Sequence, residues 1–408
     1  MSNRLYNVLY LSYDGMTDPL GQSQVIPYLQ GLAKNYQIHL ISFEKPEKKD
    51  RISSIKRLLA ASAIQWYPLT YTKKPPILST LKDLMAMKRL AFRLQKQHTF
   101  SIVHCRSYLT SLVGLSMKKK FGCKFIFDMR GFWADERIDG KIWNIKNPLY
   151  RVIYHYFKNK EKEFLKEADY TITLTHAARE IIHGWQHIPN QPVPIEVIPC
   201  CVDTMLFNPE NVGNPATTRQ KLGIAPTDFV LSYLGSIGTW YMLPEMLRFF
   251  AYWLKEHPFS VFLFITAESP ENIFQVAQTQ GIPKEKILIR KANREEVPIF
   301  LSVSDASIFF IKPTFSKQAS SPTKQGELMS MGIPIICNKG VGDTDFVVEK
   351  YRSGILLENF CEEEYQKAVR QLSAFKVERE AIRGGAEDFY SLTKGVDTYK
   401  RVYEQLLR

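Results

Sequence analysis

The sequence contains little that marks a secreted or membrane-spanning protein. The only apolar run near its start is the short VLYL that begins at Val8, so no signal peptide is expected. The most apolar long stretch, residues 231–254, is interrupted by Glu245, Arg248 and glycines, which argues against a transmembrane helix. We therefore expect a cytoplasmic protein.

Metal-binding patterns are equally scarce. The six cysteines form no CxxC pair and no zinc spacing, so we expect reduced, buried thiols. Of the eight histidines, His183 and His187 stand four residues apart, but they lack a third partner. Asp343, Thr344 and Asp345 follow a glycine turn and are interpreted as a solvated loop. We expect no metal and no other cofactor.

Acidic residues are scarce in the first half of the chain. The whole sequence has 54 Lys and Arg against 41 Asp and Glu, a net charge of +13. Residues 1–190 contain 30 of these basic residues and only 15 of the acidic ones, so they carry the entire basic excess. This asymmetry predicts an anionic partner for the first half, which could be nucleic acid, a membrane surface or a phosphorylated substrate.

Runs of β-branched and aromatic residues alternate with helical patterns along the chain. Continuous apolar runs such as IFFI, in place of alternating ones, are typical of parallel strands that are covered on both faces. The pattern predicts an α/β protein with two doubly wound, Rossmann-like domains facing across a cleft. We expect strands at 6–13, 37–43, 65–70, 101–104, 124–128, 170–174, 229–234, 261–266, 286–289, 306–311, 333–337 and 354–357.

The domain boundary is expected in residues 189–227, which are rich in Pro, Asn and Thr. We assign an N-terminal domain to 1–205 and a C-terminal domain to 206–388. Residues 389–408 form an amphipathic helix that we expect to pack back on the N-terminal domain.

The segment SSPTKQGELMSMGIPII, residues 320–336, predicts a helix suited to an anion. Ser321 suits the N-cap and Pro322 the first helical position, and a helix start beyond a parallel strand is a phosphate site. Lys324 adds a cation, and Glu327 on the same face could accept hydrogen bonds from sugar hydroxyls. An ordinary capped surface helix with one Lys–Glu pair remains the alternative.

Two neighbouring segments support the anion interpretation. Lys312 and Lys317 lie on the loop that leads to this helix and favour a diphosphate. The turn in YLGSIGTWY, residues 233–241, is a second candidate, because backbone N–H groups beside Gly235 could approach a ligand closely.

Four segments together resemble family 4 glycosyltransferases of the GT-B fold. They are VIPCCVDTMLFNP (197–209), ADYTITLTHAARE (168–180), PTKQGELMSMGIPII with the GVGD turn at 340–343, and YLSYDGMTDPLGQSQVIPYLQGLA with Gly21 at the second glycine position. The resemblance implies transfer of a hexose from a nucleotide-sugar, with retention at the anomeric carbon and no essential metal. The nucleotide-sugar is then a co-substrate, and a UDP- or GDP-sugar is expected.

The resemblance also assigns donor-binding residues. Glu327 takes the position of the second glutamate of the E-x7-E motif, which holds the ribose hydroxyls, whereas the first falls at Ala319. Ser236 and Trp240 stand where Arg and Lys usually bind the diphosphate, so nearby lysines are the expected cations. The donor candidates are Gly21, Gly235, Ser236, Arg290, Lys312, Lys317, Ser321, Thr323, Lys324 and Glu327.

Catalytic and acceptor candidates come from FIFDMRGFWADE, residues 125–136. Arg130 stands where many family members carry a histidine near the reacting sugar, so Arg130 and Glu327 are the catalytic candidates. Asp135 or Glu136 would bind acceptor hydroxyls, and Asp14 on the first loop is a further acceptor candidate. A salt bridge that only fixes the loop is the alternative for Arg130.

Residues 73–98 combine seven cations with one acid, Asp83, and with apolar residues at helical spacing. This is a basic amphipathic helix, which either packs on its own sheet or docks on an anionic inner leaflet. The second interpretation fits a glycan or lipid-linked acceptor in bacterial surface polysaccharide or lipopolysaccharide synthesis. A nucleotide-sugar epimerase of the same fold and a non-enzymatic nucleic-acid-binding protein are the alternatives, although no nucleic-acid partner is expected.

Overall fold

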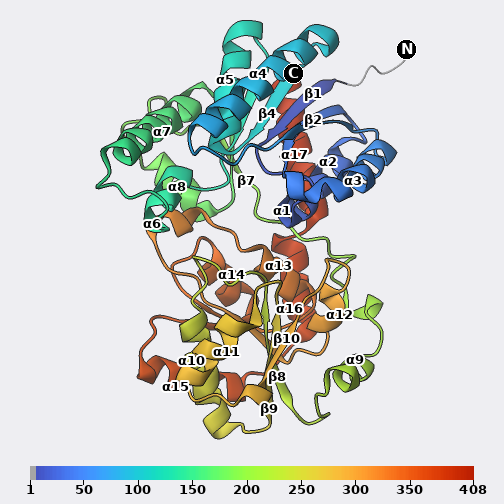
Figure 1. Cartoon of the computed structure of the whole chain (residues 1–408), viewed down its shortest axis with the longest axis vertical. Coiled ribbons are helices and arrows are strands. Elements are labelled where there is room, and N and C mark those ends of the chain that lie inside the picture. The colour runs from blue at the N-terminus through green and yellow to red at the C-terminus, as the bar shows by residue number, and fades with distance from the viewer. Residues whose placement is uncertain (1–5) are drawn as a thin grey trace. The chain divides into compact units, whose positions relative to one another are not determined.

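The computed structural model describes residues 6–408, which form two compact units (Figure 1). The first unit contains the chain up to Pro199 together with Leu392–Arg408, and the second contains Cys200–Ser391. These boundaries differ by a few residues from the predicted 205/206 and 388/389. The reason is that the segment after Cys200 pairs within the second unit, where the Val202 N–H donates to the Tyr390 carbonyl at 2.8 Å.

The first unit is built on a seven-stranded sheet in the order β3-β2-β1-β4-β5-β6-β7, with every pair parallel. β7 is absent from the predicted strands, because three residues next to prolines give no recognisable pattern. The strands are β1 (Asn7–Ser12), β2 (Gln37–Glu44), β3 (Gln65–Thr70), β4 (Ile102–Arg106), β5 (Lys124–Asp128), β6 (Tyr170–Thr173) and β7 (Ile195–Val197).

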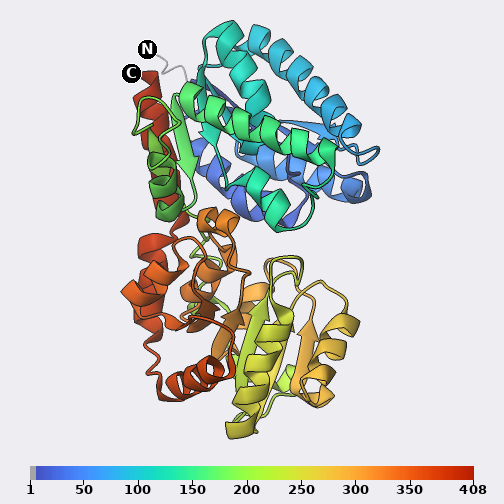
Figure 2. The same cartoon turned by 90° about the vertical axis from the view of Figure 1, so that its left-hand side faces the viewer.

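Helices cover this sheet in two layers. Right-handed crossovers place α2 and α3 on one face and α4, α5 and α7 on the other, with α5 packed between α4 and α7 (Figure 2). The helices are α1 (Pro19–Gln24), α2 (Ile26–Leu32), α3 (Lys49–Ala61), α4 (Leu78–His98), α5 (Ser107–Phe121), α6 (Trp133–Asp139), α7 (Pro148–Glu167), α8 (His176–His183) and α17 (Leu392–Leu407), with a 3-10 turn η1 (Pro46–Lys48).

The C-terminal helix α17 is an integral part of the first unit. It packs on α2 so closely that a Cβ at Gly31 would lie 2.6 Å from Val396 Cγ1. Its apolar stripe buries Tyr399, Val402 and Tyr403. The packing therefore joins the end of the chain to its beginning.

The second unit contains a six-stranded parallel sheet in the order β10-β9-β8-β11-β12-β13. The strands are β8 (Phe229–Leu234), β9 (Ser260–Ile265), β10 (Ile287–Arg290), β11 (Ala306–Phe309), β12 (Ile335–Asn338) and β13 (Gly354–Leu357). The helices and 3-10 turns are η2 (Pro209–Asn211), α9 (Pro215–Leu222), α10 (Leu243–Glu256), α11 (Pro270–Thr279), η3 (Lys284–Lys286), α12 (Val297–Leu301), η4 (Phe315–Ala319), α13 (Thr323–Ser330), α14 (Thr344–Tyr351), α15 (Glu362–Ala374) and α16 (Arg379–Phe389).

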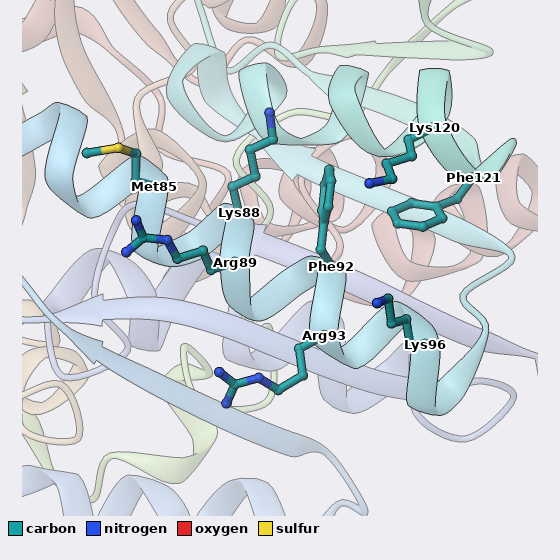
Figure 3. Close-up of a pocket in the computed structure, with 8 residues that line it drawn as sticks. All are labelled: Met85, Lys88, Arg89, Phe92, Arg93, Lys96, Lys120 and Phe121. Atoms are coloured by element: carbon teal, nitrogen blue, oxygen red, sulfur yellow. The ribbon is translucent and has the colours of Figure 1, made fainter.

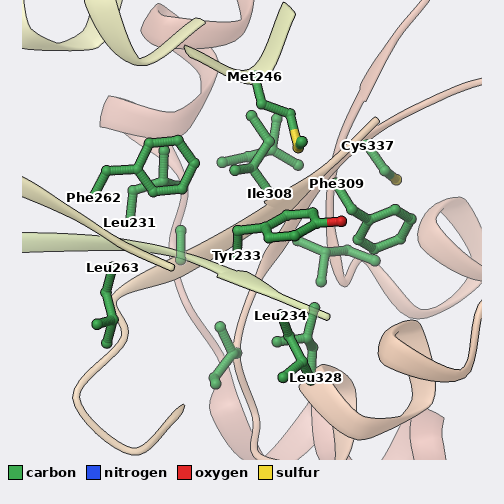
Figure 4. Close-up of a cluster of buried hydrophobic side chains, with 14 of the residues drawn as sticks. Leu231, Tyr233, Leu234, Met246, Phe262, Leu263, Ile308, Phe309, Leu328 and Cys337 are labelled. Atoms are coloured by element: carbon green, nitrogen blue, oxygen red, sulfur yellow. The ribbon is translucent and has the colours of Figure 1, made fainter. Parts of the chain in front are cut away.

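The core of the second unit explains its apolar strands. On one face of the sheet, Phe262 and Ile308 point toward Met246 of α10, and on the other face Leu234 lies beside Leu328 of α13 (Figure 4). Because both faces of this sheet are covered, strand residues of either orientation are apolar. The predicted pair of parallel α/β sheets is confirmed. No helix within residues 6–408 is long and apolar enough to cross a membrane.

Candidate functional site

The start of α13 lies beyond the carboxyl end of β11 and differs from the prediction. The helix begins at Thr323 with Pro322 as its N-cap, and no side chain caps it. The prediction of Ser321 as the capping residue is wrong, because the Ser321 Oγ instead accepts a hydrogen bond from the Cys200 N–H at 3.1 Å. The first N–H groups of α13 therefore have no side-chain acceptor and are suited to an anion.

Lys324, in the first turn of α13, is held against two aromatic rings. Only 6% of the residue is exposed, and its Nζ donates to the Tyr233 Oη at 3.0 Å. The ammonium lies 3.6 Å from the centre of the Tyr241 ring and 4.2 Å from that of Tyr233. Burial lowers the pKa of Lys324 well below its usual value, and the attraction of Glu327 offsets only part of this effect. A bound anion would restore the charge.

The glycine turn after β8 meets this lysine. Gly235 has a left-handed φ of 109°, and a Cβ at this position would lie 3.4 Å from the Lys324 Nζ. The next residue, Ser236, is anchored through its carbonyl, which accepts a hydrogen bond from the Tyr233 hydroxyl. The turn and the helix therefore present backbone groups and one ammonium at the same place.

A second lysine reaches the same turn from η4. The Lys317 Nζ lies 3.7 Å from the centre of the Trp240 ring, and the residue is buried. Trp240 stands where the resemblance expects a lysine. The ammonium of Lys317 therefore supplies a positive charge beside the position at which the sequence lacks one.

Glu327, one turn further along α13, forms a buried ion pair. Its Oε1 accepts a hydrogen bond from the Arg294 Nη1 at 3.0 Å, and the Arg294 guanidinium lies 5.3 Å from the centre of the Phe207 ring. Burial raises the pKa of Glu327, although Arg294 and Lys324 oppose this effect. Sequence reasoning missed Arg294, since a basic residue in a charged loop gives no sign of its partner.

Two predicted donor residues stay apart from this cluster. Arg290 ends the edge strand β10, and its Nη1 donates to the adjacent Ile289 carbonyl at 2.8 Å. Lys312 follows β11 and has an exposed side chain. Within residues 6–408, neither side chain shares a hydrogen bond or ion pair with Lys324 or Glu327. The structure therefore brings together Gly235, Ser236, Lys317, Thr323, Lys324 and Glu327, but neither Arg290 nor Lys312.

In the first unit, Asp128 ends β5 and forms the centre of a buried polar network. Its Oδ2 lies 3.2 Å from the Tyr399 Oη and 3.4 Å from the His104 Nε2. Its Oδ1 lies 3.8 Å from an Arg130 guanidinium nitrogen. Burial alone would raise the pKa of Asp128, but Arg130 and His104 together hold it below its usual value. Asp128 is therefore a carboxylate at neutral pH.

Arg130 adopts an unusual backbone conformation in this network. Its φ is 59°, in the left-handed region that costs a non-glycine residue on the order of 1–2 kcal/mol. The following Gly131 also has a positive φ, of 133°. This tight turn after β5 directs the guanidinium back toward Asp128, so the ion pair and the turn depend on each other.

Arg106 is a buried cation that sequence reasoning missed. It ends β4, next to β5, and its Nε donates to the Asp14 Oδ2 at 3.2 Å. Its Nη1 is buried and has no hydrogen-bond partner in the described part of the chain. Asp14 therefore pairs with a buried arginine at the carboxyl end of β4, where the sequence pattern showed only a strand end.

The acceptor candidates differ in whether side chains of the same unit already bind their carboxylates. The two Asp135 oxygens accept hydrogen bonds from the Tyr154 Oη and the Lys158 Nζ, both at 2.8 Å. Asp135 is therefore occupied by groups of its own unit. Glu136 is half-buried in the first turn of α6, and the Asp14 side chain remains 43% exposed beside Arg106.

Gly21 and Glu44 shape the first loop of the same sheet. Gly21 in α1 is buried, and a Cβ there would lie 2.2 Å from the Gly15 carbonyl oxygen. The Glu44 carboxylate accepts hydrogen bonds from the N–H groups of Met16 at 2.8 Å and Thr17 at 3.0 Å. Gly21 therefore leaves room for the close approach of the Gly15 backbone. Glu44, which sequence reasoning missed, fixes the conformation of the loop.

Buried histidines in the first unit predict sensitivity to acid. Burial lowers the pKa of His104, and it lowers that of His39 to about 4, with His98 contributing. Both groups are neutral when folded and bind protons more readily when unfolded. Their contribution is therefore complete above the unfolded pKa near 6.5 and is lost as the pH falls. We expect the melting temperature to fall as the pH drops from 7.5 to 5.5, because each histidine then contributes up to about 1.4 kcal/mol less to the stability of the folded state.

Thermal unfolding of the full chain across this pH range measures the effect. In the variant His39→Gln, the fall in melting temperature should be shallower than in the wild type. An equal slope in both proteins would contradict the role of His39.

No group of three or more His, Cys, Asp or Glu side chains is arranged to hold a metal ion anywhere in residues 6–408. In the first turn of α14, Asp345 accepts a hydrogen bond from the Gly340 N–H of the preceding loop at 3.2 Å. Asp343 is the N-cap residue of α14. These two aspartates therefore belong to the start of a helix.

Known proteins resemble this chain in sequence over part of its length and in fold over nearly all of it. Residues 24–206 match the family model described as Glycosyltransferase Family 4. The matched residues make up less than half of the chain. No curated protein matches the sequence.

Solved structures match nearly the whole chain at low identity. Sucrose-phosphate synthase from Thermosynechococcus elongatus has a TM-score of 0.77 and 14% identity, covering 98% of this chain and 99% of that one. Anabaena Alr3699/HepE in complex with UDP and glucose has a TM-score of 0.70 and 14% identity, covering 97% and 99%. WaaG, a glycosyltransferase involved in lipopolysaccharide biosynthesis, has a TM-score of 0.67 and 15% identity, covering 96% and 99%. The chain therefore has the GT-B fold of glycosyltransferases, and its N-terminal half matches glycosyltransferase family 4.

Proposed function

We propose that this protein is a glycosyltransferase that moves a hexose from a UDP- or GDP-sugar to a glycan or lipid-linked acceptor, with retention and without an essential metal. The observation that carries the proposal is the cluster at the start of α13: the helix has no side-chain cap, Lys324 in its first turn lies beside the Gly235 turn, and Lys317 lies on Trp240 of the same turn. The UDP and UDP-glucose complexes of Alr3699/HepE support a nucleotide-sugar donor.

The cluster suits a departing nucleoside diphosphate. Negative charge grows on the diphosphate as the sugar leaves, and preorganised N–H groups and ammonium groups stabilise that charge without further rearrangement. Glu327, which is ion-paired with Arg294, would accept hydrogen bonds from the ribose hydroxyls. In a retaining reaction of this kind the leaving phosphate takes the acceptor's proton, so the protein needs no nucleophile.

The first unit supplies the acceptor-side groups in this proposal. Arg130 is fixed by Asp128, and Asp14 is fixed by Arg106, at the carboxyl ends of adjacent strands. Arg130 would contact the transferred sugar or its acceptor, and Asp14 and Glu136 would bind acceptor hydroxyls. We place this reaction in the cytoplasm, in surface polysaccharide or lipopolysaccharide synthesis, and the likeness to WaaG supports that pathway.

A panel of nucleotides tests the donor proposal. We expect UDP or GDP to raise the melting temperature of the full chain, since a ligand at 100 times its Kd adds about 2.7 kcal/mol to stability. ADP and CMP should give smaller shifts. The stabilising nucleotide then identifies the sugar donor, whose slow hydrolysis without acceptor would show that it is turned over.

Two outcomes would contradict this proposal. The first is the absence of stabilisation by any of the four nucleotides. The second is conversion of a UDP-sugar into a different UDP-sugar without acceptor, which would indicate an epimerase.

We also propose that α4 contacts an anionic membrane on which the acceptor lies. The face of α4 that packs inward contains Asp83, Met87 and Ala91. The outward face instead exposes Leu78 at 64%, with Leu81 and Met85 at 51% each. The outward face also presents the cations Lys82, Lys88, Arg89, Arg93 and Lys96.

An apolar and basic outward face supports docking on the surface of an anionic bilayer. Flotation of the full chain with phosphatidylcholine vesicles, with and without phosphatidylglycerol, tests this contact. Equal recovery from both kinds of vesicle would contradict it.

A further inference from the structure

Two helices of the first unit enclose a basic groove. It is a hollow of about 550 Å³ between α4 and the end of α5 (Figure 3). Five cations and three apolar side chains form its walls, and no acidic residue does. These residues are Met85, Lys88, Arg89, Phe92, Arg93, Lys96, Lys120 and Phe121.

The cations of the groove have no acidic partners. The lysine run in α5 shows the contrast, since Lys118 pairs with Asp169 at 2.9 Å and Lys119 with Glu163 at 2.7 Å. Lys120, the next residue, forms no ion pair with any residue of the described range 6–408, and its Nζ instead lies 5.2 Å from the centre of the Phe92 ring. Throughout residues 6–408, none of the five cations of the groove forms a salt bridge.

Aromatic rings hold two of these ammonium groups in place. Lys88 lies 5.4 Å and Lys120 lies 5.2 Å from the centre of the same Phe92 ring, from two different helices. Phe121 packs edge-on against Phe92 at 5.0 Å. Charges of one sign are therefore gathered without neutralisation, and this arrangement attracts an anion.

The groove lies away from the carboxyl edge of the sheet. α5 starts at Ser107, directly after β4 ends at Arg106, and Lys120 stands near the other end of that helix. At 1.5 Å per residue, this separation is roughly 20 Å. The groove therefore cannot share a ligand group with Arg106, Arg130 or Asp14.

We propose that this groove binds the phosphate of an anionic phospholipid headgroup in a bilayer. Lysine and arginine donors suit phosphate oxygens, and the volume is in the range of small-molecule sites. Met85 belongs both to the groove and to the exposed apolar face with Leu78 and Leu81. That continuity favours a ligand that carries a phosphate and an acyl chain over a soluble anion.

This inference rests on the membrane contact proposed above. Two variants that remove the same charge distinguish specific binding in the groove from a general attraction of the protein to an anionic membrane. The groove variant carries Lys88→Gln, Arg93→Gln and Lys120→Gln. The control variant carries Lys119→Gln, Lys124→Gln and Lys160→Gln, which remove the same charge from lysines that form ion pairs in the same unit.

Co-sedimentation with phosphatidylglycerol–phosphatidylcholine vesicles measures the partition coefficient of each full-length protein. At about 1 kcal/mol per cation near an anionic surface, the groove variant should bind roughly 100-fold more weakly than the wild type. The control variant should lose less than about threefold, because its lysines are already neutralised by neighbours. Stabilisation by the nucleotide that stabilises the wild type should be unchanged in both variants, which shows that they fold.

Each of three other outcomes would contradict one of these proposals. Equal losses in the two variants would mean that net charge attracts the protein and that the groove binds nothing specific. Complete competition by 10-fold excess glycerol 3-phosphate over lipid would assign the groove to a soluble phosphate. Absence of wild-type binding to anionic vesicles would refute the membrane contact itself and leave the donor proposal intact.

Discussion

Replacing Lys324 with alanine should reduce kcat/KM for the sugar donor by roughly 100- to 1,000-fold, the loss typical of removing one group that stabilises a developing oxyanion. Lys324 is buried in the first turn of α13 beside the Gly235 turn, so water cannot take its place. Initial rates with the donor identified by the nucleotide panel measure this change.

Lys312→Ala is the matched control for Lys324→Ala. Lys312 is on the same approach to α13 but is exposed and separate from the cluster, so kcat/KM should change by less than about threefold. Comparable losses in both variants would move the diphosphate away from the start of α13 and contradict the proposed site.

Proton uptake distinguishes a charge-binding role of Lys324 from a structural one. Burial lowers the pKa of Lys324 in the free protein, and a bound diphosphate should raise it. At a pH between the two values, the protein should therefore take up a proton when the nucleotide binds. Calorimetry in buffers of different ionisation enthalpy detects this uptake, which should disappear in Lys324→Ala.

Replacing Asp128 with asparagine should lower the free energy of unfolding of the first unit by about 3–5 kcal/mol, because it removes the fully buried carboxylate at the centre of an ionic and hydrogen-bonded network. Arg130 lies 3.8 Å from the Asp128 carboxylate, and His104 and Tyr399 contact its other oxygen. Urea denaturation of the full chain, followed by a signal from the first unit, measures the difference.

Asp14→Asn provides the comparison at the same edge of the sheet. The Asp14 side chain is 43% exposed, so its attraction to Arg106 is screened by water, and Arg106 also feels the charge of Asp128; the loss should therefore stay within about 1 kcal/mol. A small loss for Asp128→Asn would show that Asp128 carries no charge in the folded protein, and the network would then need reinterpretation.

Much of the fold could be predicted because it depends on local patterns. Buried parallel strands such as β8 (Phe229–Leu234) and β12 (Ile335–Asn338) need apolar residues on both faces, so they stand out without knowledge of their neighbours. The Gly332 stop of α13 also has a local cause, since its φ of 66° favours glycine. β7 has neither length nor a distinct pattern, and it escaped prediction.

The side chains of the site were predictable only where a motif carried them. Lys324 and Glu327 follow from the helix pattern and the resemblance, whereas Arg294 is recognised only by its contact with Glu327, 33 residues away. Ser321 illustrates the opposite error, because its sequence context suits a cap while its hydroxyl binds Cys200, 121 residues away. Partners of this kind depend on tertiary packing, which local sequence does not encode.

The return of α17 to the first unit has a consequence for synthesis of the chain. The Tyr403 hydroxyl contacts His104 across 299 residues, and the Tyr399 hydroxyl contacts Asp128 across 271. A ribosome therefore releases the whole second unit before these phenols can reach their partners. During most of translation, the polar network of the first unit therefore lacks two of its members. The first unit can complete its folding only after α17 has been synthesised.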